Sequence, residues 1–297
     1  MNSISRVLLI INPNSGGGKS LDLAEICIDF LHLHAFGYSS YSTVKPNDLD
    51  GIQKSIIEYQ PDAIIIVGGD GTIKEVINVP EARALPLLLV PGGTGNDYSQ
   101  VLFADKTLWD ILKSLQSPNI REVDVGICND SYFLNGVGIG FDGSIAAQTN
   151  QGKTTFLYNA WKYWIAIFRN ILFYKSSQLR VEFGAQVIEN KIFMISVANG
   201  KAYGGGFKVS PESIIDDGKY NLLIINALHP IIRLFEIPIL QNGKHLKKSY
   251  VQHFCLDNDI TVSGSKPIFA HLDGEVMIAE KFNIRMGGKL KVFRTVH

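Results

Sequence analysis

The chain has 297 residues, of which 46% are hydrophobic and 19% charged, and its 28 basic side chains balance its 28 acidic ones. This length exceeds what one hydrophobic core usually organises, so we expect two domains. The neutral balance argues against a nucleic-acid partner, because extended contact with phosphates calls for a basic face.

Cysteine usage and hydropathy narrow the class of protein further. Cys27, Cys128 and Cys255 are far apart and lack the spacing of a zinc site or a disulfide framework, which fits a reducing cytoplasm. The N-terminal apolar run is short and predicts a first strand rather than a signal peptide. We expect no transmembrane segment, because no stretch offers about 18 uninterrupted apolar residues.

The first predicted strand, residues 6–11, leads into a loop of small residues at 12–20 and then a helix over 21–35. The loop ends in GKS, but Pro13 stands where a P-loop needs glycine, so the P-loop pattern fails. The free N–H groups of such a loop suit contact with phosphate. A mobile glycine connector explains the same residues equally well.

A strand over 38–44 and a helix over 48–60 are predicted next, followed by an apolar, buried strand over 62–67. The sequence GGDGT then places Asp70 in a glycine turn, and Thr72 is predicted to cap the following helix. A carboxylate beside a phosphate is repulsive unless a divalent cation lies between them. The segment therefore indicates a magnesium–nucleotide site, with a tight packing turn as the alternative.

Another buried strand, 85–90, ends in the glycine-rich segment 91–97, and a helix is predicted over 105–116. The first 120 residues thus alternate strand and helix, which predicts a parallel sheet with helices on both faces. Ligands of such sheets bind beyond the carboxyl ends of the strands. We therefore expect the three glycine turns to meet at one nucleotide site.

Beyond residue 120 the pattern changes to short strands separated by Asn, Asp and Gly, starting with a hairpin over 121–137. Such strands predict an antiparallel sandwich or barrel. We place an α/β domain at 1–127 and a β-sandwich domain at 128–283. Further strands are predicted over residues 178–183, 191–198, 220–226, 250–256, 260–263, 267–272, 282–287 and 289–295.

Three further segments of the second half carry distinctive patterns. Residues 136–143 match a dinucleotide fingerprint poorly and favour a close-approach turn. Residues 155–174 predict an aromatic helix, which we expect to be internal rather than at a lipid interface. Residues 231–241 predict a helix that Pro238 kinks.

Acidic residues gather at two turns, LDGE (272–275) and DDGK (216–219). In an extended segment Asp273 and Glu275 point to the same side, where they suit a metal ligand beside a general base. A surface turn with two solvated acids is the alternative. The histidines show no metal-ligand spacing.

Seven motifs occur in order along the whole chain: NPNSG (12–16), GGDGTIKEVIN (68–78), PGGTGND (91–97), DVG (124–126), NGVGIGFDG (135–143), DDGKY (216–220) and LDGE (272–275). Together they resemble the diacylglycerol kinase catalytic family, in its short bacterial soluble lipid-kinase branch. The resemblance implies an α/β domain with a parallel sheet of the NAD kinase and phosphofructokinase-like type, and an all-β sandwich domain. It also implies that 284–297 returns to the first domain.

The same resemblance implies the roles of individual residues. Glu275 is the expected proton acceptor, and Asp70, Asp124 and Asp273 are expected to organise the catalytic Mg²⁺. A second, structural Mg²⁺ is expected on Asp217 and the carbonyls of Ile214 and Lys219. The ATP-binding residues implied are Asn12, Pro13, Asn14, Ser15, Gly16, Thr43, Gly69, Asp70, Gly71, Thr72, Glu75 and Thr94.

The function implied is an ATP-dependent lipid kinase of phospholipid metabolism that acts on diacylglycerol or a related lipid alcohol. We expect a cytoplasmic protein that meets its lipid substrate at the membrane surface, and a homodimer is left open. One alternative is a kinase of a soluble substrate such as NAD or a sugar phosphate. The other is a non-catalytic nucleotide-binding regulator, which would have no need of a general base such as Glu275.

Overall fold

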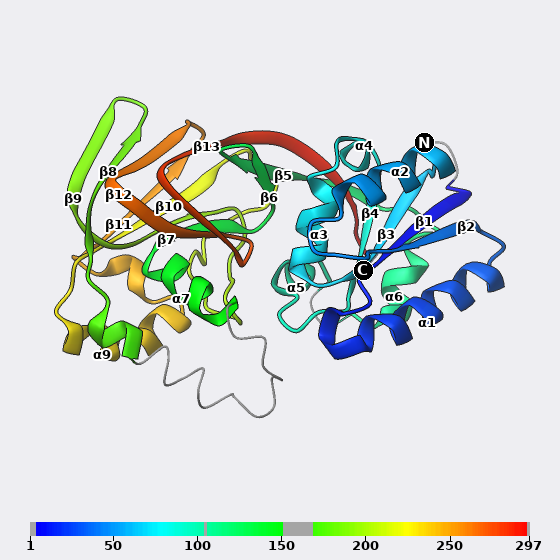
Figure 1. Cartoon of the computed structure of the whole chain (residues 1–297), viewed down its shortest axis with the longest axis horizontal. Coiled ribbons are helices and arrows are strands. Elements are labelled where there is room, and N and C mark those ends of the chain that lie inside the picture. Colours follow the sequence, from blue (N-terminus) through cyan, green and yellow to red (C-terminus); the bar gives the residue numbers. More distant parts are fainter. Residues whose placement is uncertain (1–3, 104–105, 151–168, 296–297) are drawn as a thin grey trace. The chain divides into compact units, whose positions relative to one another are not determined.

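The computed structural model describes residues 4–103, 106–150 and 169–295, and the chain forms two compact units (Figure 1). Unit 1 comprises Met1–Val125 and Gly288–His297, and unit 2 comprises Gly126–Gly287. Two strands, β5 (Ile120–Cys128) and β13 (Glu275–Phe293), carry the chain from one unit to the other. The C-terminal residues therefore belong to unit 1.

Unit 1 is built on a parallel sheet in the order β2 (Gly37–Ser42), β1 (Arg6–Ile11), β3 (Ala63–Gly68) and β4 (Leu87–Pro91), with the end of β13 beside β4. The apolar side chains of β1, β3 and β4 are almost fully buried. Runs of this kind arise because helices cover both faces of a parallel sheet. The predicted α/β architecture is confirmed.

The described residues of unit 1 include the helices α1 (Lys19–Leu33), α2 (Leu49–Tyr59), α3 (Asp70–Ile77), α4 (Pro80–Arg83), α5 (Asp97–Phe103) and α6 (Leu108–Lys113). The helix predicted over 105–116 is wrong at both ends. It starts after Thr107, whose side chain and that of Asp110 form a capping box. The short helix α5 is not predicted by the sequence pattern.

Unit 2 is an antiparallel assembly in the order β11 (Val251–Leu256), β10 (Tyr220–Asn226), β9 (Gln186–Ala198), β7 (Gly136–Gly140), β12 (Ile260–Leu272) and β13. Strand β8 (Ser177–Phe183) pairs with both β9 and β12. Side chains from these strands form a large core, which includes Ile195, Tyr220, Val262 and Phe282, and a second, smaller cluster, which includes Leu223. The expected all-β second domain is confirmed.

Tight hairpins shape unit 2, among them β8–β9, in which Phe183 lies opposite Gln186. β5 and β6 (Ser131–Phe133) place Cys128 opposite Ser131, as the sequence predicts. β12 and β13 place Leu272 opposite Glu275. Three of the predictions differ from the structure. Residues 260–263 and 267–272 lie in a single strand, β12, and 282–287 and 289–295 lie in a single strand, β13. Residues 136–143 form strand β7 followed by helix α7 (Phe141–Asn150).

The predicted helix over 231–241 is present as α9 (Pro230–Gln241), with Pro238 inside it. Most of the predicted aromatic helix over 155–174 lies outside the described residues, and only 169–173 is described as helical. Across the parts of the chain that the structure describes, every helix is too short or too polar to cross a membrane.

Candidate functional site

The three glycine turns of unit 1 meet at the carboxyl ends of β1, β3 and β4, as the sequence predicts. The Ser15 hydroxyl in the first turn accepts a hydrogen bond of 3.0 Å from the Gly69 N–H in the second. The Gly92 N–H in the third turn donates to the Gly68 carbonyl at 2.9 Å. Backbone groups from three separate loops are thereby fixed at one edge of the sheet.

The second and third turns touch backbone to backbone at Gly93. A Cβ at this position would lie 2.4 Å from the Gly69 Cα and 2.9 Å from the Asn96 Oδ1. The closer of the two, the Gly69 Cα, is a backbone atom and cannot move aside as the end of a side chain could. The glycine is therefore required by the close approach of the two turns.

Replacing Gly93 with alanine should lower the free energy of unfolding of unit 1 by about 2 kcal/mol, because the added methyl forces the two turns apart. Thermal unfolding followed by circular dichroism measures the effect. Gly37→Ala is the matched control, since the nearest atom to its added methyl is 3.4 Å away. Equal melting temperatures for the two variants would contradict this account of Gly93.

Asn12 and Thr72 join the first turn to α3. The Asn12 Nδ2 donates to the Thr72 Oγ1 at 3.1 Å, and the Asn12 Oδ1 accepts from the Asn14 N–H at 3.1 Å. The prediction that Thr72 caps α3 is wrong. The N-cap is Gly69, with no side-chain cap, and Thr72 lies buried inside the first turn of the helix, with Gly71 just before it.

Asp70 fixes the third turn to α3. Its two carboxylate oxygens accept hydrogen bonds from the Asp97 N–H at 3.1 Å and the Tyr98 N–H at 3.2 Å, at the start of α5. Burial raises the pKa of Asp70, although these backbone donors favour its charged form. The sequence pattern singled out Asp70 but missed that α5 begins at its carboxylate.

Asn96, which the sequence analysis did not single out, folds the third turn on itself. Its Oδ1 accepts from the Gly93 N–H and its Nδ2 donates to the Gly93 carbonyl, both at 2.8 Å. Its backbone is left-handed, with φ of 55°, a conformation that asparagine tolerates. The closed turn leaves Thr94 exposed.

The remaining residues implied for nucleotide binding have different surroundings. Thr43 is buried just after β2, and its N–H donates to the Ile11 carbonyl at 2.9 Å. Glu75 is buried in α3, where its Oε1 accepts from the Asn47 N–H at 2.9 Å. Pro13 is half-buried in the first turn, and Gly16 is exposed there.

Asp124 stands on β5 within unit 1 and is 1% exposed. The Lys289 Nζ lies 3.8 Å from its Oδ1. Lys289 comes from the end of β13 that returns to unit 1. A residue near the C-terminus therefore lies close to a carboxylate that is distant in the sequence. Sequence reasoning did not identify this lysine.

In unit 2 the LDGE segment (272–275) closes the β12–β13 hairpin, and Asp273 and Gly274 are the two residues of its turn. Asp273 and Gly274 both have left-handed backbones, with φ of 48° and 88°. An Asp-Gly pair with positive φ at both positions is the usual sequence of a type I′ hairpin turn. The argument that Asp273 and Glu275 share one side of an extended strand is therefore wrong, because the chain reverses between them.

The Asp273 carboxylate is nevertheless not a solvated surface group. It accepts hydrogen bonds from the N–H groups of Leu134 (2.7 Å), Asn135 (2.9 Å) and Gly136 (2.9 Å). Glu275 begins β13, directly after this turn, and its side chain is partly exposed. The β12–β13 turn and the segment before β7 are thus held together by one side chain beside Glu275.

A buried polar cluster that the sequence did not reveal lies next to the same turn. The His271 Nε2 is 3.0 Å from the Asp142 Oδ2, and the Gly274 N–H donates to the His271 Nδ1 at 3.3 Å. Burial opposes the charged form of Asp142, but His271 outweighs it and holds the pKa of that carboxyl below its usual value. Burial and Asp142 together raise the pKa of Tyr203.

The turn expected to hold a structural Mg²⁺ is compact. The Asp217 Oδ1 accepts a hydrogen bond of 3.0 Å from the Lys219 N–H. Ile214, three residues before Asp217, has an exposed side chain. Among the described residues of either unit, no group of three or more His, Cys, Asp or Glu side chains is placed to hold a metal ion. The site on Asp217 would accordingly depend on backbone carbonyls.

The fold and these turns define a two-domain α/β plus all-β protein with the loop motifs of the diacylglycerol kinase class. Residues 6–128 match the diacylglycerol kinase catalytic domain, and residues 135–292 match the YegS C-terminal NAD kinase β-sandwich-like domain. The chain belongs to the family that carries these two domains. The resemblance noted from the seven motifs is confirmed.

Curated relatives support the same placement. A diacylglycerol kinase of Staphylococcus saprophyticus is 28% identical over 277 residues, which cover 91% of this chain and 88% of the relative. Diacylglycerol kinases of Staphylococcus epidermidis and Staphylococcus aureus are each 26% identical, covering 91% of this chain and 85% and 86% of the relative. The similarity therefore extends through both units.

Two solved structures from Bacillus anthracis strain Sterne share the fold. One superimposes with a TM-score of 0.78 at 22% identity and covers 100% of both chains. The other, of a diacylglycerol kinase, superimposes with a TM-score of 0.71 at 21% identity, again over 100% of both chains. The two-domain fold is thus common to chains that share few residues.

Proposed function

We propose that this chain is a Mg²⁺- and ATP-dependent lipid kinase that phosphorylates the hydroxyl of diacylglycerol or a related lipid alcohol. The observation that carries the proposal is the meeting of three glycine turns at one edge of the unit 1 sheet, in a chain of the diacylglycerol kinase family. The relatives from Staphylococcus are named diacylglycerol kinases.

The ATP phosphates are proposed to bind where the three turns meet. The Ser15, Asn12 and Asn96 side chains accept hydrogen bonds from backbone N–H groups of these loops and so hold the loops in place. The N-terminus of α3 adds the positive end of its dipole, which favours an anion. Thr43 and Glu75, which are buried and bonded to backbone, would act by holding the neighbouring segments in place.

The carboxylates of Asp70, Asp124 and Asp273 have donor chemistry that fits Mg²⁺, which prefers oxygen ligands. Both oxygens of Asp70 accept N–H bonds, from Asp97 and Tyr98, and a carboxylate oxygen can accept more than one partner. Mg²⁺, when bound, would neutralise charge on the transferring phosphoryl group. A second Mg²⁺ is proposed on Asp217 with the carbonyls of Ile214 and Lys219.

Glu275 is proposed to accept the proton of the lipid hydroxyl. The hydroxyl oxygen forms a bond to the γ-phosphorus while the bond from that phosphorus to the β–γ bridging oxygen breaks, and ADP leaves. A hydroxyl is a poor nucleophile, so loss of its proton in the transition state assists attack. Fixed backbone donors supply most of the remaining acceleration, because phosphoryl transfer depends on positioning and electrostatics.

The direct test is a phosphorylation assay of the full chain with radiolabelled ATP and diacylglycerol in mixed micelles. We expect a labelled phospholipid that requires Mg²⁺ and disappears with EDTA. NAD and fructose 6-phosphate serve as soluble acceptors. Labelling of either one without labelling of diacylglycerol would overturn the lipid assignment, and ATP binding without any transfer would indicate a regulator.

A further inference from the structure

Helix α9 of unit 2 exposes the wrong face for a helix surrounded by water. Phe235 and Ile231 on its outside are 72% and 57% exposed, while Arg233 on its inside is 7% exposed. A helix on the surface of a globular protein normally buries its apolar stripe and exposes its charges. In α9 this arrangement is reversed.

The exposed residues form a continuous apolar stripe. Ile231, Phe235 and Pro238 follow one another at intervals of four and three residues, and such positions lie on one face of a helix. Ile232, also exposed, lies beside them. Glu236 points away from the stripe and faces Lys248, 3.7 Å away.

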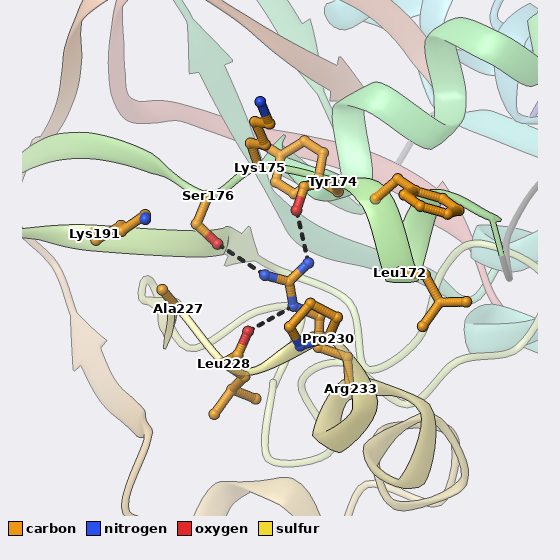
Figure 2. Close-up of a pocket in the computed structure, with 10 residues that line it drawn as sticks. Leu172, Tyr174, Lys175, Ser176, Lys191, Ala227, Leu228, Pro230 and Arg233 are labelled. Carbon is orange, nitrogen blue, oxygen red and sulfur yellow. Dashed lines mark hydrogen bonds between the residues drawn. The ribbon is translucent and has the colours of Figure 1, made fainter.

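The inward orientation of Arg233 is held by several contacts. Its guanidinium donates to the carbonyls of Ile171 (3.0 Å), Tyr174 (2.8 Å) and Leu228 (2.9 Å). It also lies 4.7 Å from the centre of the Phe193 ring. Figure 2 shows the guanidinium hydrogen-bonded to Tyr174, Ser176 and Leu228. Since Arg233 is fixed inside, the stripe on the opposite side is fixed outside.

A cavity of about 640 Å³ opens beside the N-terminus of α9 (Figure 2). Its lining includes Pro230 and Arg233 from α9, the 74% exposed Phe173, and two exposed lysines, Lys175 and Lys191. The described residues that line this cavity include basic and apolar side chains but no acidic one. The exposed apolar stripe therefore borders positive charge.

We propose that this face of unit 2 docks on an anionic lipid bilayer. The apolar side chains of Phe173, Ile231, Ile232 and Phe235 enter the interface, and Lys175 and Lys191 contact the phosphates of lipid headgroups. Apolar residues flanked by lysines are the combination that binds anionic membranes. Charge favours a membrane over a second copy of the same face, which would oppose lysine to lysine.

Such a surface would bring the chain to a lipid substrate. Its biological purpose rests on the proposed function, but the binding itself does not. It can be tested without catalysis. The full chain is sedimented, without ATP, with vesicles of phosphatidylcholine alone or with about 30% of the anionic lipid phosphatidylglycerol. We expect binding to the anionic vesicles.

The decisive variant is Ile231→Gln/Phe235→Gln, which changes two exposed side chains and leaves the contacts of Arg233 intact. We expect its vesicle affinity to fall about tenfold or more, since burial of apolar area drives interfacial binding. Leu33→Gln/Val187→Gln is the control, because these side chains are 70% and 52% exposed outside α9. Equal binding by the two double variants would overturn the proposal.

The lysines are tested by Lys175→Gln/Lys191→Gln, which should remove most of the preference for phosphatidylglycerol. A preference equal to that of the unchanged chain would overturn their role. Light scattering adds a further check. A wild-type dimer that the Ile231→Gln/Phe235→Gln variant converts to a monomer, with vesicle binding unchanged, would overturn the membrane assignment and identify a second copy as the occupant.

The two proposals fail separately. If the chain phosphorylates diacylglycerol in micelles but ignores anionic vesicles, the docking surface is wrong and the lipid kinase assignment stands. If it binds the vesicles through α9 but phosphorylates no lipid, the docking surface stands and the kinase assignment falls.

Discussion

Replacing Glu275 with glutamine should lower the rate of phosphoryl transfer by a factor of about 10² to 10⁴, the usual contribution of a general base. Glutamine has nearly the same size but cannot take a proton from the lipid hydroxyl. Because the side chain of Glu275 is partly exposed at the first residue of β13, the substitution should leave the fold of unit 2 intact. Rate and stability should therefore separate.

The measurement is the turnover number in diacylglycerol micelles at saturating ATP, together with the melting temperature of the same preparation. Glu280→Gln is the matched control, because it removes an exposed carboxylate from the same strand, five residues further along. We expect the control to keep full turnover. A Glu275→Gln enzyme as fast as the control would remove Glu275 from the mechanism.

The KM for ATP gives a second distinction. Glu275 is proposed to act on the acceptor hydroxyl, so its loss should reduce kcat with little change in ATP affinity. A variant that instead lost ATP affinity with kcat preserved would show that Glu275 helps to bind the nucleotide. That result would contradict the role of proton acceptor.

The sequence predicted best those features that one segment of chain determines by itself. The apolar runs at 6–11, 62–67 and 85–90 predict buried parallel strands because both faces of such strands are covered. The alternation of strand and helix then places the following turns at one edge of the sheet. The meeting of the three glycine turns was therefore predictable without any knowledge of their contacts.

The features that sequence reasoning missed depend on contacts between distant segments or on the path of a turn. Asp142, Tyr203 and His271 come from three separate parts of unit 2, and no local spacing relates them. Asp273 and Glu275 were placed on one face because the segment was treated as extended, although Asp-Gly itself favours a turn. The short helix α5 begins inside a glycine-rich motif, where no periodic pattern of apolar residues is present to predict a helix.

Helix α9 shows a different limit. Its pattern, PIIRLFEIPILQ, is apolar nearly all round, which fits a buried helix and an interfacial helix equally well. Only the packing of Arg233 against the carbonyls of Ile171 and Tyr174 decides which side faces inward. The periodicity of the sequence therefore predicts the helix but not the face that it exposes.

Replacing Asp273 with alanine should destabilise unit 2 by about 3 to 5 kcal/mol, even without any metal or nucleotide. The carboxylate accepts three backbone hydrogen bonds, from Leu134, Asn135 and Gly136. Hydrogen bonds to a charged group contribute about 1.5 to 3 kcal/mol each, and alanine would leave all three donors without this acceptor. The expected loss is smaller than the sum of the three, because Asp273 is partly exposed and water can replace part of the bonding. A fall of about 10 °C in melting temperature is expected for a unit of this size.

The comparison that decides the role of Asp273 is thermal unfolding in EDTA, with Asp130→Ala as the control. Asp130 is an exposed carboxylate in the neighbouring β5–β6 turn, and its loss should shift the melting temperature by less than about 2 °C. If Asp273 served only as a ligand of Mg²⁺, its removal would not affect stability in EDTA. Equal melting temperatures for the two variants would therefore assign Asp273 to the metal alone, whereas a large difference would show that the same carboxylate builds the turn that presents Glu275.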